Sequence, residues 1–198
     1  MGQAMVDVGL NNGKVLMLGG SDLDNNTKLV EQGFMEVMDR YGITIVDSIH
    51  ATNWKAEIAS DYVRDNPEVV NQVNGIMCGN DNLAAFAIKA LMENRLGGKV
   101  CVVGQDADLE ACQRIVEGTQ YMTVYKPVEK LALEAAEQAV ILGKDEPLGL
   151  QETFNDGTYD VPYLRLEPIA VTKDNMDEII TGKYHQKSEI YLNVSEEK

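Results

Sequence analysis

Two apolar, strand-like segments of this sequence end in a charged side chain that could bind a ligand. The run Lys99–Val103 is followed by Gly-Gln-Asp-Ala-Asp, which contains Asp106, and the run Tyr121–Tyr125 is followed by Lys126 and a proline. In an open parallel sheet, ligands bind at the carboxyl ends of the strands. No nucleophile or metal-binding cluster accompanies this carboxylate and this ammonium. We therefore expect hydrogen bonding to a small, polar, hydroxylated molecule.

Further polar side chains follow the other predicted strands. They are Asp24, Asn25 and Asn26 after the first strand, Trp54 after the second, Asn80 and Asp81 after the third, and Gln105 beside Asp106 after the fourth. A carboxylate accepts hydrogen bonds from two adjacent hydroxyls, whereas an amide both donates and accepts. Bonds that involve an ionised group are the stronger ones. An indole ring covers the apolar face of a sugar and offers one N–H. Together these groups are typical of a sugar-binding site.

Each of these residues also has a structural explanation that needs no ligand. The Asp-Asn-Asn segment at 24–26 and the Asn-Asp pair at 80–81 can cap the helices that follow them. Trp54 can belong to the core, Asp106 can cap a helix, and Lys126 can be a solvated charge. Binding is favoured because all of them lie on one predicted edge of one sheet.

Strand-like and helix-like segments alternate along most of the chain. The expected strands are Lys14–Leu18, Ile43–Ile49, Gly75–Cys78, Lys99–Val103 and Tyr121–Tyr125. Apolar residues at helical spacing predict helices over Thr27–Tyr41, Lys55–Arg64, Leu83–Asn94, Leu109–Glu117 and Val128–Leu142. This order predicts an α/β fold, an open, mostly parallel sheet with helices on both faces. After Gly143 the pattern changes, and the Asn-Asp-Gly sequence at 155–157 indicates a turn between two extended runs.

Charge and hydropathy argue against two classes of protein. The 198 residues carry a formal net charge of −15, and so acidic a surface repels nucleic acid. No apolar stretch approaches the ~20 residues of a transmembrane helix. The first residues also lack the basic region and the apolar core of a signal peptide.

No enzyme or metal site is indicated by the sequence. Its three cysteines have no Cys-x-x-Cys spacing, which argues against a disulfide framework or a zinc site. The Gly-Gly-Ser segment at 19–21 lacks the lysine of a phosphate-binding loop. His50 ends a strand on the proposed edge and is a candidate for a contact at its rim, whereas His185 is expected to be structural or solvated. We expect no catalytic residue, no metal ligand and no cofactor.

Four segments resemble the periplasmic sugar-binding proteins of the ribose-binding type (type 1). They are GKVLMLGGSDLDNNTKL, GIMCGNDNLAAFAIKAL, GQDADLEACQRIVEGTQYMTVYKP and PIAVTKDNMDEIITGKYHQKSE. Within that family, the GQDAD and GTQ-x-MTVYKP blocks are specific to the xylose binders of ABC transporters, whereas GND is more widely shared. The resemblance implies a passive binder of D-xylose or a related monosaccharide, without catalysis.

The resemblance also implies a set of ligand-binding residues. Carried over by motif, they are Asp24, Asn26, Trp54, Asn80, Asp106 and Lys126. The two aspartates and Asn26 would bond sugar hydroxyls, and Asn80 would bridge. The indole would stack on the sugar or donate its N–H, and the lysine would approach from the hinge between two lobes.

Members of this family have two lobes, and the resemblance aligns the chain with the carboxy-terminal one. We expect residues 1–127 and 143–198 to form the sugar-binding lobe, and residues 128–142 to form a crossover helix that normally packs on the amino-terminal lobe. The chain is thus expected to lack an export signal, while its parent works in the periplasm or as a cell-surface lipoprotein. A homodimer or a complementing amino-terminal lobe would cover the apolar face of the helix, formed by Leu131, Ala135, Ala139 and Leu142.

Other functions stay open at this point. A sugar sensor that partners a membrane histidine kinase, instead of an ABC permease, would share the fold and the site. The effector domain of a repressor-type transcription regulator shares the ancestry, but the sequence contains no helix-turn-helix and is very acidic. An uncharacterised enzyme would need an acid–base pair beside an activated nucleophile, which no motif provides. Neighbouring genes would separate transport, sensing and repression: a permease and ATPase indicate a transporter, a kinase indicates a sensor, and neither indicates the repressor domain.

Overall fold

The computed structural model describes residues 1–194, which form two compact units. The first contains residues 1–125 and the chain from Ala170 onward, and the second contains Lys126–Ile169. This division differs from the expected one, because residues 143–169 group with the crossover helix instead of with the sugar-binding lobe. The physical reason is local packing, since Leu131 of that helix and the leucines at 164 and 166 line the same pocket.

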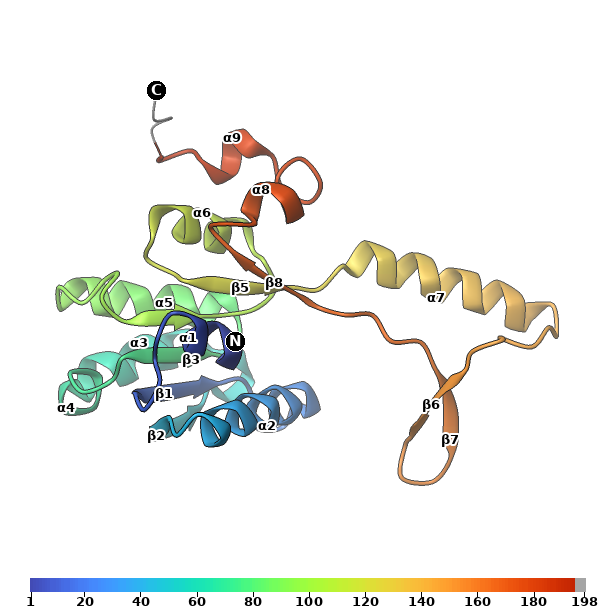
Figure 1. Ribbon diagram of the computed structural model, residues 1–198, viewed down its shortest axis with the longest axis horizontal. Helices are drawn as coiled ribbons and strands as arrows, with labels where there is room; N and C mark the ends of the chain where they lie inside the picture. Colours follow the sequence, from blue (N-terminus) through green and yellow to red (C-terminus); the bar gives the residue numbers. More distant parts are fainter. Residues whose placement is uncertain (195–198) are drawn as a thin grey trace. The chain divides into compact units, whose positions relative to one another are not determined.

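A six-stranded sheet forms the centre of the first unit (Figure 1). In spatial order its strands are β2 (Thr44–His50), β1 (Lys14–Gly19), β3 (Gly75–Cys78), β4 (Cys101–Val103), β5 (Met122–Tyr125) and β8 (Ile169–Thr172). Strand β1 pairs in parallel with β2 and β3, β3 with β4, and β4 with β5. The predicted mostly parallel α/β fold is therefore confirmed. The strand order reverses between β1 and β3, which is where open α/β sheets bind ligands.

Helices cover both faces of this sheet (Figure 1). Helices α1 (Gly2–Asp7) and α2 (Asn25–Arg40) pack on one face, and η1 (Thr52–Trp54), α3 (Glu57–Asp65), α4 (Pro67–Val70) and α5 (Asp81–Glu93) pack on the other. Side chains of β1 alternate between the faces: Leu16 and Leu18 join the cluster of α3 and α5, whereas Val15 and Met17 join that of α2. Each such buried side chain stabilises the fold by about 1.5–3 kcal/mol.

The remaining helices of the first unit follow β4 and β8. They are α6 (Leu109–Glu117), α8 (Met176–Ile179) and α9 (Lys187–Ile190), and α6 packs beside α9. Helices α1, α4 and α9 were not predicted, because each is six residues or shorter and too short for its apolar spacing to stand out. None of the helices in residues 1–194 is long and apolar enough to cross a membrane.

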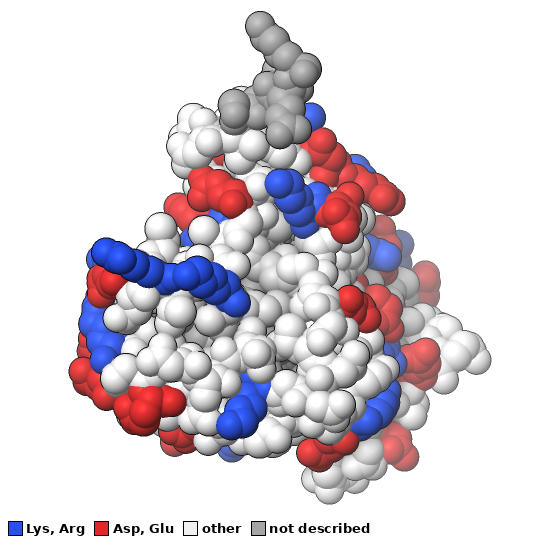
Figure 2. Space-filling model, turned by 60° about the vertical axis from the view of Figure 1, so that its left-hand side comes forward, with Lys and Arg blue, Asp and Glu red and all other residues white. Residues whose placement is uncertain are grey.

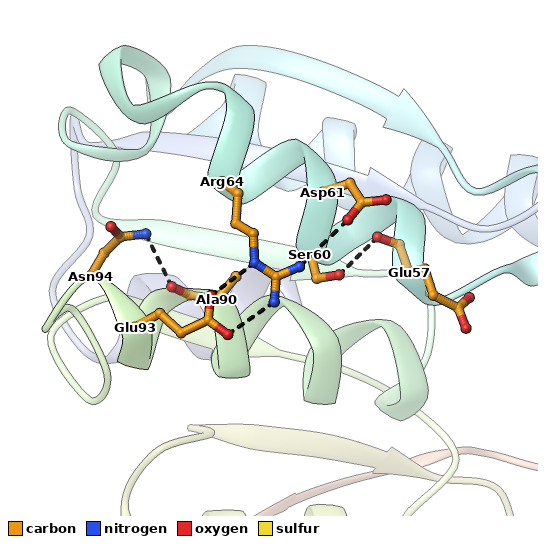
Figure 3. A network of polar contacts seen from close by, with 7 residues as sticks. All are labelled: Glu57, Ser60, Asp61, Arg64, Ala90, Glu93 and Asn94. Atoms are coloured by element: carbon orange, nitrogen blue, oxygen red, sulfur yellow. Dashed lines mark hydrogen bonds and ion pairs between the residues drawn. The ribbon is translucent and has the colours of Figure 1, made fainter.

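Helices α3 and α5 are joined by both apolar and polar contacts. Val63 of α3 and Leu91 of α5 belong to one buried cluster. At the surface, Arg64 donates from Nε and Nη2 to the Glu93 carboxylate at 2.8 and 2.9 Å, and from Nη1 to Asp61 at 3.4 Å (Figure 3). Exposed ion pairs contribute little to stability. The buried cluster therefore holds the two helices together. The bidentate contact of Arg64 with Glu93 adds a link of defined geometry at the surface.

The second unit consists of α7 (Val128–Gly143) and a hairpin of β6 (Glu152–Asn155) and β7 (Asp160–Tyr163). The hairpin turns at the predicted Asn-Asp-Gly segment, where the Gly157 N–H donates to Asn155 Oδ1 at 2.9 Å. Phe154 and Tyr163 pack against each other across the hairpin in a tilted arrangement, with ring centroids 5.8 Å apart. Helix α7 has no buried residue, and every residue of both strands is exposed. Helices and two-stranded hairpins owe most of their stability to packing of an apolar face. The second unit therefore lacks the burial that would stabilise its helix and hairpin.

A glycine substitution tests the close approach of β1 and β3. A Cβ added at Gly79 would lie 2.7 Å from the Gly20 backbone nitrogen, so Gly79→Ala must push two strand ends apart. We expect it to lower the free energy of unfolding by about 1–3 kcal/mol. A Cβ at Gly33, inside α2, meets nothing within 4 Å, so Gly33→Ala should raise stability by about 0.5–1 kcal/mol. Urea unfolding of both variants checks this, and an unchanged midpoint for Gly79→Ala would contradict it.

Candidate functional site

The carboxyl ends of β1, β3 and β4 are joined by short hydrogen bonds. The Gly79 N–H donates to Leu18 O at 2.8 Å, and Gln105 Nε2 donates to Gly79 O at 2.6 Å. The Asp81 N–H donates to Gln105 O at 2.9 Å. The three loops that carry most of the predicted ligand residues therefore start from one edge of the sheet, as the sequence predicted.

Trp54 lies over this edge. It ends the short 3₁₀-helix after β2 and has a left-handed backbone conformation, with φ 58°. A Cβ added at Gly20 would lie 2.1 Å from Trp54 Cη2, so only a glycine leaves room for the indole ring. The half-buried ring packs against the cluster of α3 and α5 and lines a narrow crevice with Gly79 and Gln105. The ring therefore packs on the core, as one of the two sequence interpretations has it, and its contact with a sugar stays a prediction.

Asp24 and Asn80 cap the helices that follow their strands, which confirms the structural interpretation of these residues. Asp24 Oδ1 accepts from the Asn26 N–H at 2.8 Å, and Asn80 Oδ1 accepts from the Leu83 N–H at 2.9 Å. Each capping bond engages one oxygen of the side chain. Asp24 and Asn80 are half-buried and Asn26 is exposed, so capping leaves these side chains at the surface of the edge.

Asp106 has an unusual backbone conformation. Its φ is 108°, and Ala107 follows with φ 56°, a region in which non-glycine residues are uncommon and cost energy. The Asp106 N–H donates to Val124 O of β5 at 2.9 Å, and its side chain is half-buried. The structure therefore holds this carboxylate at the edge in a conformation that the local sequence does not favour.

Lys126 belongs to the second unit, whereas the other five predicted residues belong to the first. It is exposed and follows directly after β5. The predicted lysine contact with the sugar therefore stays a prediction.

Below the edge, Asp81 forms a buried polar centre that the sequence did not reveal. It is 1% exposed. Its Oδ1 accepts from Gln120 Nε2 at 2.8 Å, and its Oδ2 accepts from Thr123 Oγ1 at 2.7 Å and from the Asp108 N–H at 3.1 Å. Arg114 donates from Nη2 to the Asp81 carbonyl at 3.0 Å. Asp81 lies in the GND block, and Gln120 and Thr123 lie in the GTQ-x-MTVYKP block, but the sequence indicates for Asp81 only a polar edge residue or a helix cap.

Both histidine rings contact other parts of the first unit, and burial of the cysteines makes their thiols unreactive. His50 Nε2 lies 3.1 Å from Glu31 Oε2, so its ring faces α2 at the rim. His185 donates from Nε2 to Ala107 O at 2.8 Å, as expected for a structural residue. Burial raises the pKa of the thiols, to about 12 for Cys101 and Cys112, which makes them poor nucleophiles. Within residues 1–194, no three His, Cys, Asp or Glu side chains could hold a metal ion.

The titration of Asp81 gives a testable pH dependence. Burial raises its pKa from 3.8 to about 6, because the hydrogen bonds only partly offset the loss of hydration. The folded protein then binds this proton more tightly than the unfolded chain. Asp81's contribution to the free energy of unfolding therefore falls as the pH rises from about 4 to about 6, by on the order of 3 kcal/mol, and is constant above.

Urea unfolding of the wild type and of Asp81→Asn over this range measures the effect. The stability of the wild type relative to the variant should decrease as the pH rises. Carbon NMR of the Asp81 carboxyl should give a midpoint of about 6, and a midpoint at the ordinary aspartate value would contradict the assignment.

Comparison with known proteins gives the chain its family. Residues 1–146 match the periplasmic binding protein domain. The chain is 43% identical over 186 residues to the D-xylose-binding periplasmic protein of Haemophilus influenzae, which covers 90% of this chain and 56% of the relative. It is 40% identical over 194 residues to the D-xylose-binding periplasmic protein of Escherichia coli, with 95% and 58% covered. The chain thus spans a little over half the length of these relatives.

Solved structures agree with this match. A carbohydrate transporter solute-binding protein from Chloroflexus aurantiacus, in complex with D-glucose, superposes with a TM-score of 0.79 at 25% identity, over 95% of this chain and 65% of that one. An ABC transporter solute-binding protein from Clostridium phytofermentans, with bound β-D-glucose, shares the fold with a TM-score of 0.80 at 19% identity, over 95% and 64%. The chain therefore belongs to the periplasmic binding protein family.

Proposed function

We propose that this chain is the carboxy-terminal, sugar-binding lobe of the substrate-binding component of an ABC transporter, with D-xylose or a related monosaccharide as ligand. The observation that carries this proposal is the group of polar side chains at the switch point of the sheet, in a chain 43% identical to a D-xylose-binding periplasmic protein. The proposed ligand residues are Asp24, Asn26, Trp54, Asn80, Asp106 and Lys126.

In this proposal the edge binds the sugar by hydrogen bonds and one aromatic contact. The carboxylates of Asp24 and Asp106 accept from hydroxyl groups, and these charged bonds are the stronger ones. Asn26 and Asn80 can donate from their amides while accepting from a second hydroxyl. Trp54 covers an apolar C–H face or donates its N–H, and Lys126 is proposed as a further hydrogen-bond donor. Binding without catalysis agrees with the family, whose members bind and deliver solutes.

The parent protein is proposed to act outside the cytoplasmic membrane and to deliver sugar to an ABC permease. A membrane histidine kinase is the alternative partner, because a sensor would use the same edge. A repressor-type effector domain is a weaker alternative, because the relatives reported above are periplasmic proteins.

We expect this chain alone to bind sugar weakly. A pentose held on one edge keeps much of its surface in water, so its hydrogen bonds compete with solvent. The dissociation constant should be roughly millimolar or higher.

An NMR titration with D-xylose tests the site. Amide signals of residues 24–26, 54, 80 and 106 should shift, with a millimolar constant. Asp106→Asn should weaken binding about tenfold, because one charged acceptor is lost. Asp39→Asn, at the opposite end of α2, makes the same change of charge and should leave the constant within about twofold. A micromolar constant would contradict the proposed weakness, and equal effects of the two variants would contradict the site.

The second unit exposes large apolar side chains on α7 and on the hairpin, and we call them together the apolar surface. Its exposed large side chains are Val128, Leu131, Leu133, Val140, Leu142, Phe154, Tyr159, Val161 and Tyr163. Soluble proteins rarely leave so many neighbouring apolar side chains in water. We propose that a second copy of the chain or a complementing amino-terminal lobe covers this apolar surface.

Analytical ultracentrifugation tests coverage by a second copy. The wild type should form a dimer whose fraction rises with concentration. Leu131→Glu should shift it toward monomer, because it places a charge in the apolar surface. Lys130→Gln, which changes the net charge equally at an exposed neighbouring position, should not. A well-folded chain that stays monomeric at every concentration would rule the dimer out.

A further inference from the structure

The buried Asp81 carboxylate lies directly behind the loop that carries Asp106. The Asp108 N–H donates to Asp81 Oδ2 at 3.1 Å, and Thr123 Oγ1 donates to the same oxygen at 2.7 Å. Thr123 Oγ1 in turn accepts from the Ala107 N–H at 3.0 Å. The two peptide N–H groups that follow Asp106 are therefore both held by one carboxylate, one directly and one through a hydroxyl.

These bonds hold a backbone that would otherwise relax. Asp106 and Ala107 both have positive φ angles, 108° and 56°. Such conformations of non-glycine residues persist only where the surroundings over-determine them. The hydrogen bonds to the following N–H groups supply that constraint, together with the bond from the Asp106 N–H to Val124 O.

The surroundings of the Asp81 side chain present three hydrogen-bond donors and therefore favour a side chain that only accepts. Gln120 is oriented by Arg114, whose Nε donates to Gln120 Oε1 at 3.0 Å, so its amide N–H points at Asp81 Oδ1. A Cβ added at Gly104 would lie 2.4 Å from Asp81 Oδ1, so the backbone at Gly104 packs closely against this oxygen. An ionised carboxylate is acceptor-only, whereas an asparagine amide would present a donor to one of these donors.

We propose that Asp81 is a positioning residue that holds the Asp106 carboxylate in its sugar-binding place. The inference rests on the proposed function for its consequence, since Asp106 must bind sugar for its position to matter. The positioning itself is independent of any ligand.

The test is Asp81→Asn, followed by amide hydrogen exchange without sugar. The Asp106, Ala107 and Asp108 N–H groups should exchange at least about tenfold faster than in the wild type, because the loop that carries them loses its charged acceptor. Amides at the far end of the sheet should not change. Unchanged exchange at all three positions would overturn the proposal.

A second substitution should restore the loop. In the double variant Asp81→Asn with Gln120→Glu, the donor and the acceptor between the two side chains are exchanged. The new carboxylate at position 120 can still accept from Arg114, whereas the bond from Gln120 Nε2 to Met122 O is lost. The protection of residues 106–108 from hydrogen exchange should therefore recover in part in the double variant and fall in Gln120→Glu alone, where two carboxylates face each other. A double variant no better than both single ones would count against the proposed geometry.

Two controls keep the result specific. Asp108→Asn changes a carboxylate in the same loop whose side chain makes no capping bond, and it should leave the exchange rates of residues 106 and 107 within about twofold. If Asp81→Asn does not fold, Thr123→Val removes only the hydroxyl link. It should then speed exchange at Ala107 but not at Asp106, whose N–H bonds to Val124.

Sugar titration of the same variants separates the two claims. Loss of protection together with weaker xylose binding supports both. Loss of protection in the variant, with a wild-type chain that binds no pentose, refutes the proposed function and leaves the positioning intact. Weaker binding with full protection refutes the positioning.

Discussion

The close approach of backbones at the carboxyl edge of the sheet is the constraint on which this site depends. Gly20 leaves room for the Trp54 ring, Gly79 touches the Gly20 nitrogen, and Gly104 lies against the Asp81 carboxylate. A Cβ at position 79 would collide with the backbone of β1, whereas one at position 20 or 104 would displace the Trp54 ring or the Asp81 carboxylate. Because these ends are held so closely, the polar residues that follow them share one surface.

Two of the proposed ligand residues at this edge also have a structural role. Asp24 and Asn80 cap α2 and α5 with one oxygen each, and capping stabilises a helix by about 1 kcal/mol. The same bonds fix the rotamers of these side chains. A ligand site benefits, because ordered side chains lose less entropy on binding.

The side of the first unit at the amino ends of the strands carries fewer charged side chains over its centre. Figure 2 shows a broad area without charged side chains, with Lys, Arg, Asp and Glu mainly around its margin. A pocket of about 570 Å³ lies at the amino ends of β3, β4 and β5, lined among others by Lys99 and Tyr121. The pocket is larger than the crevice beside Trp54, yet the polar side chains converge at the carboxyl edge. The larger pocket therefore lies away from the carboxyl edge, which is where open α/β sheets bind ligands.

The sequence by itself determined the order of strands and helices, the parallel sheet and the edge at which polar side chains gather. These follow from periodicity and turn residues, which are local along the chain. It could also show that Asp24 and Asn80 were able to cap helices, but not that they do. Only the tertiary structure decided the role of Asp81, because its partners Gln120 and Thr123 lie 39 and 42 residues away in the sequence. It also decided the positive φ of Asp106 and the place of Lys126 in the second unit. Long-range hydrogen bonds and unit boundaries arise from packing, which no local pattern of residues encodes.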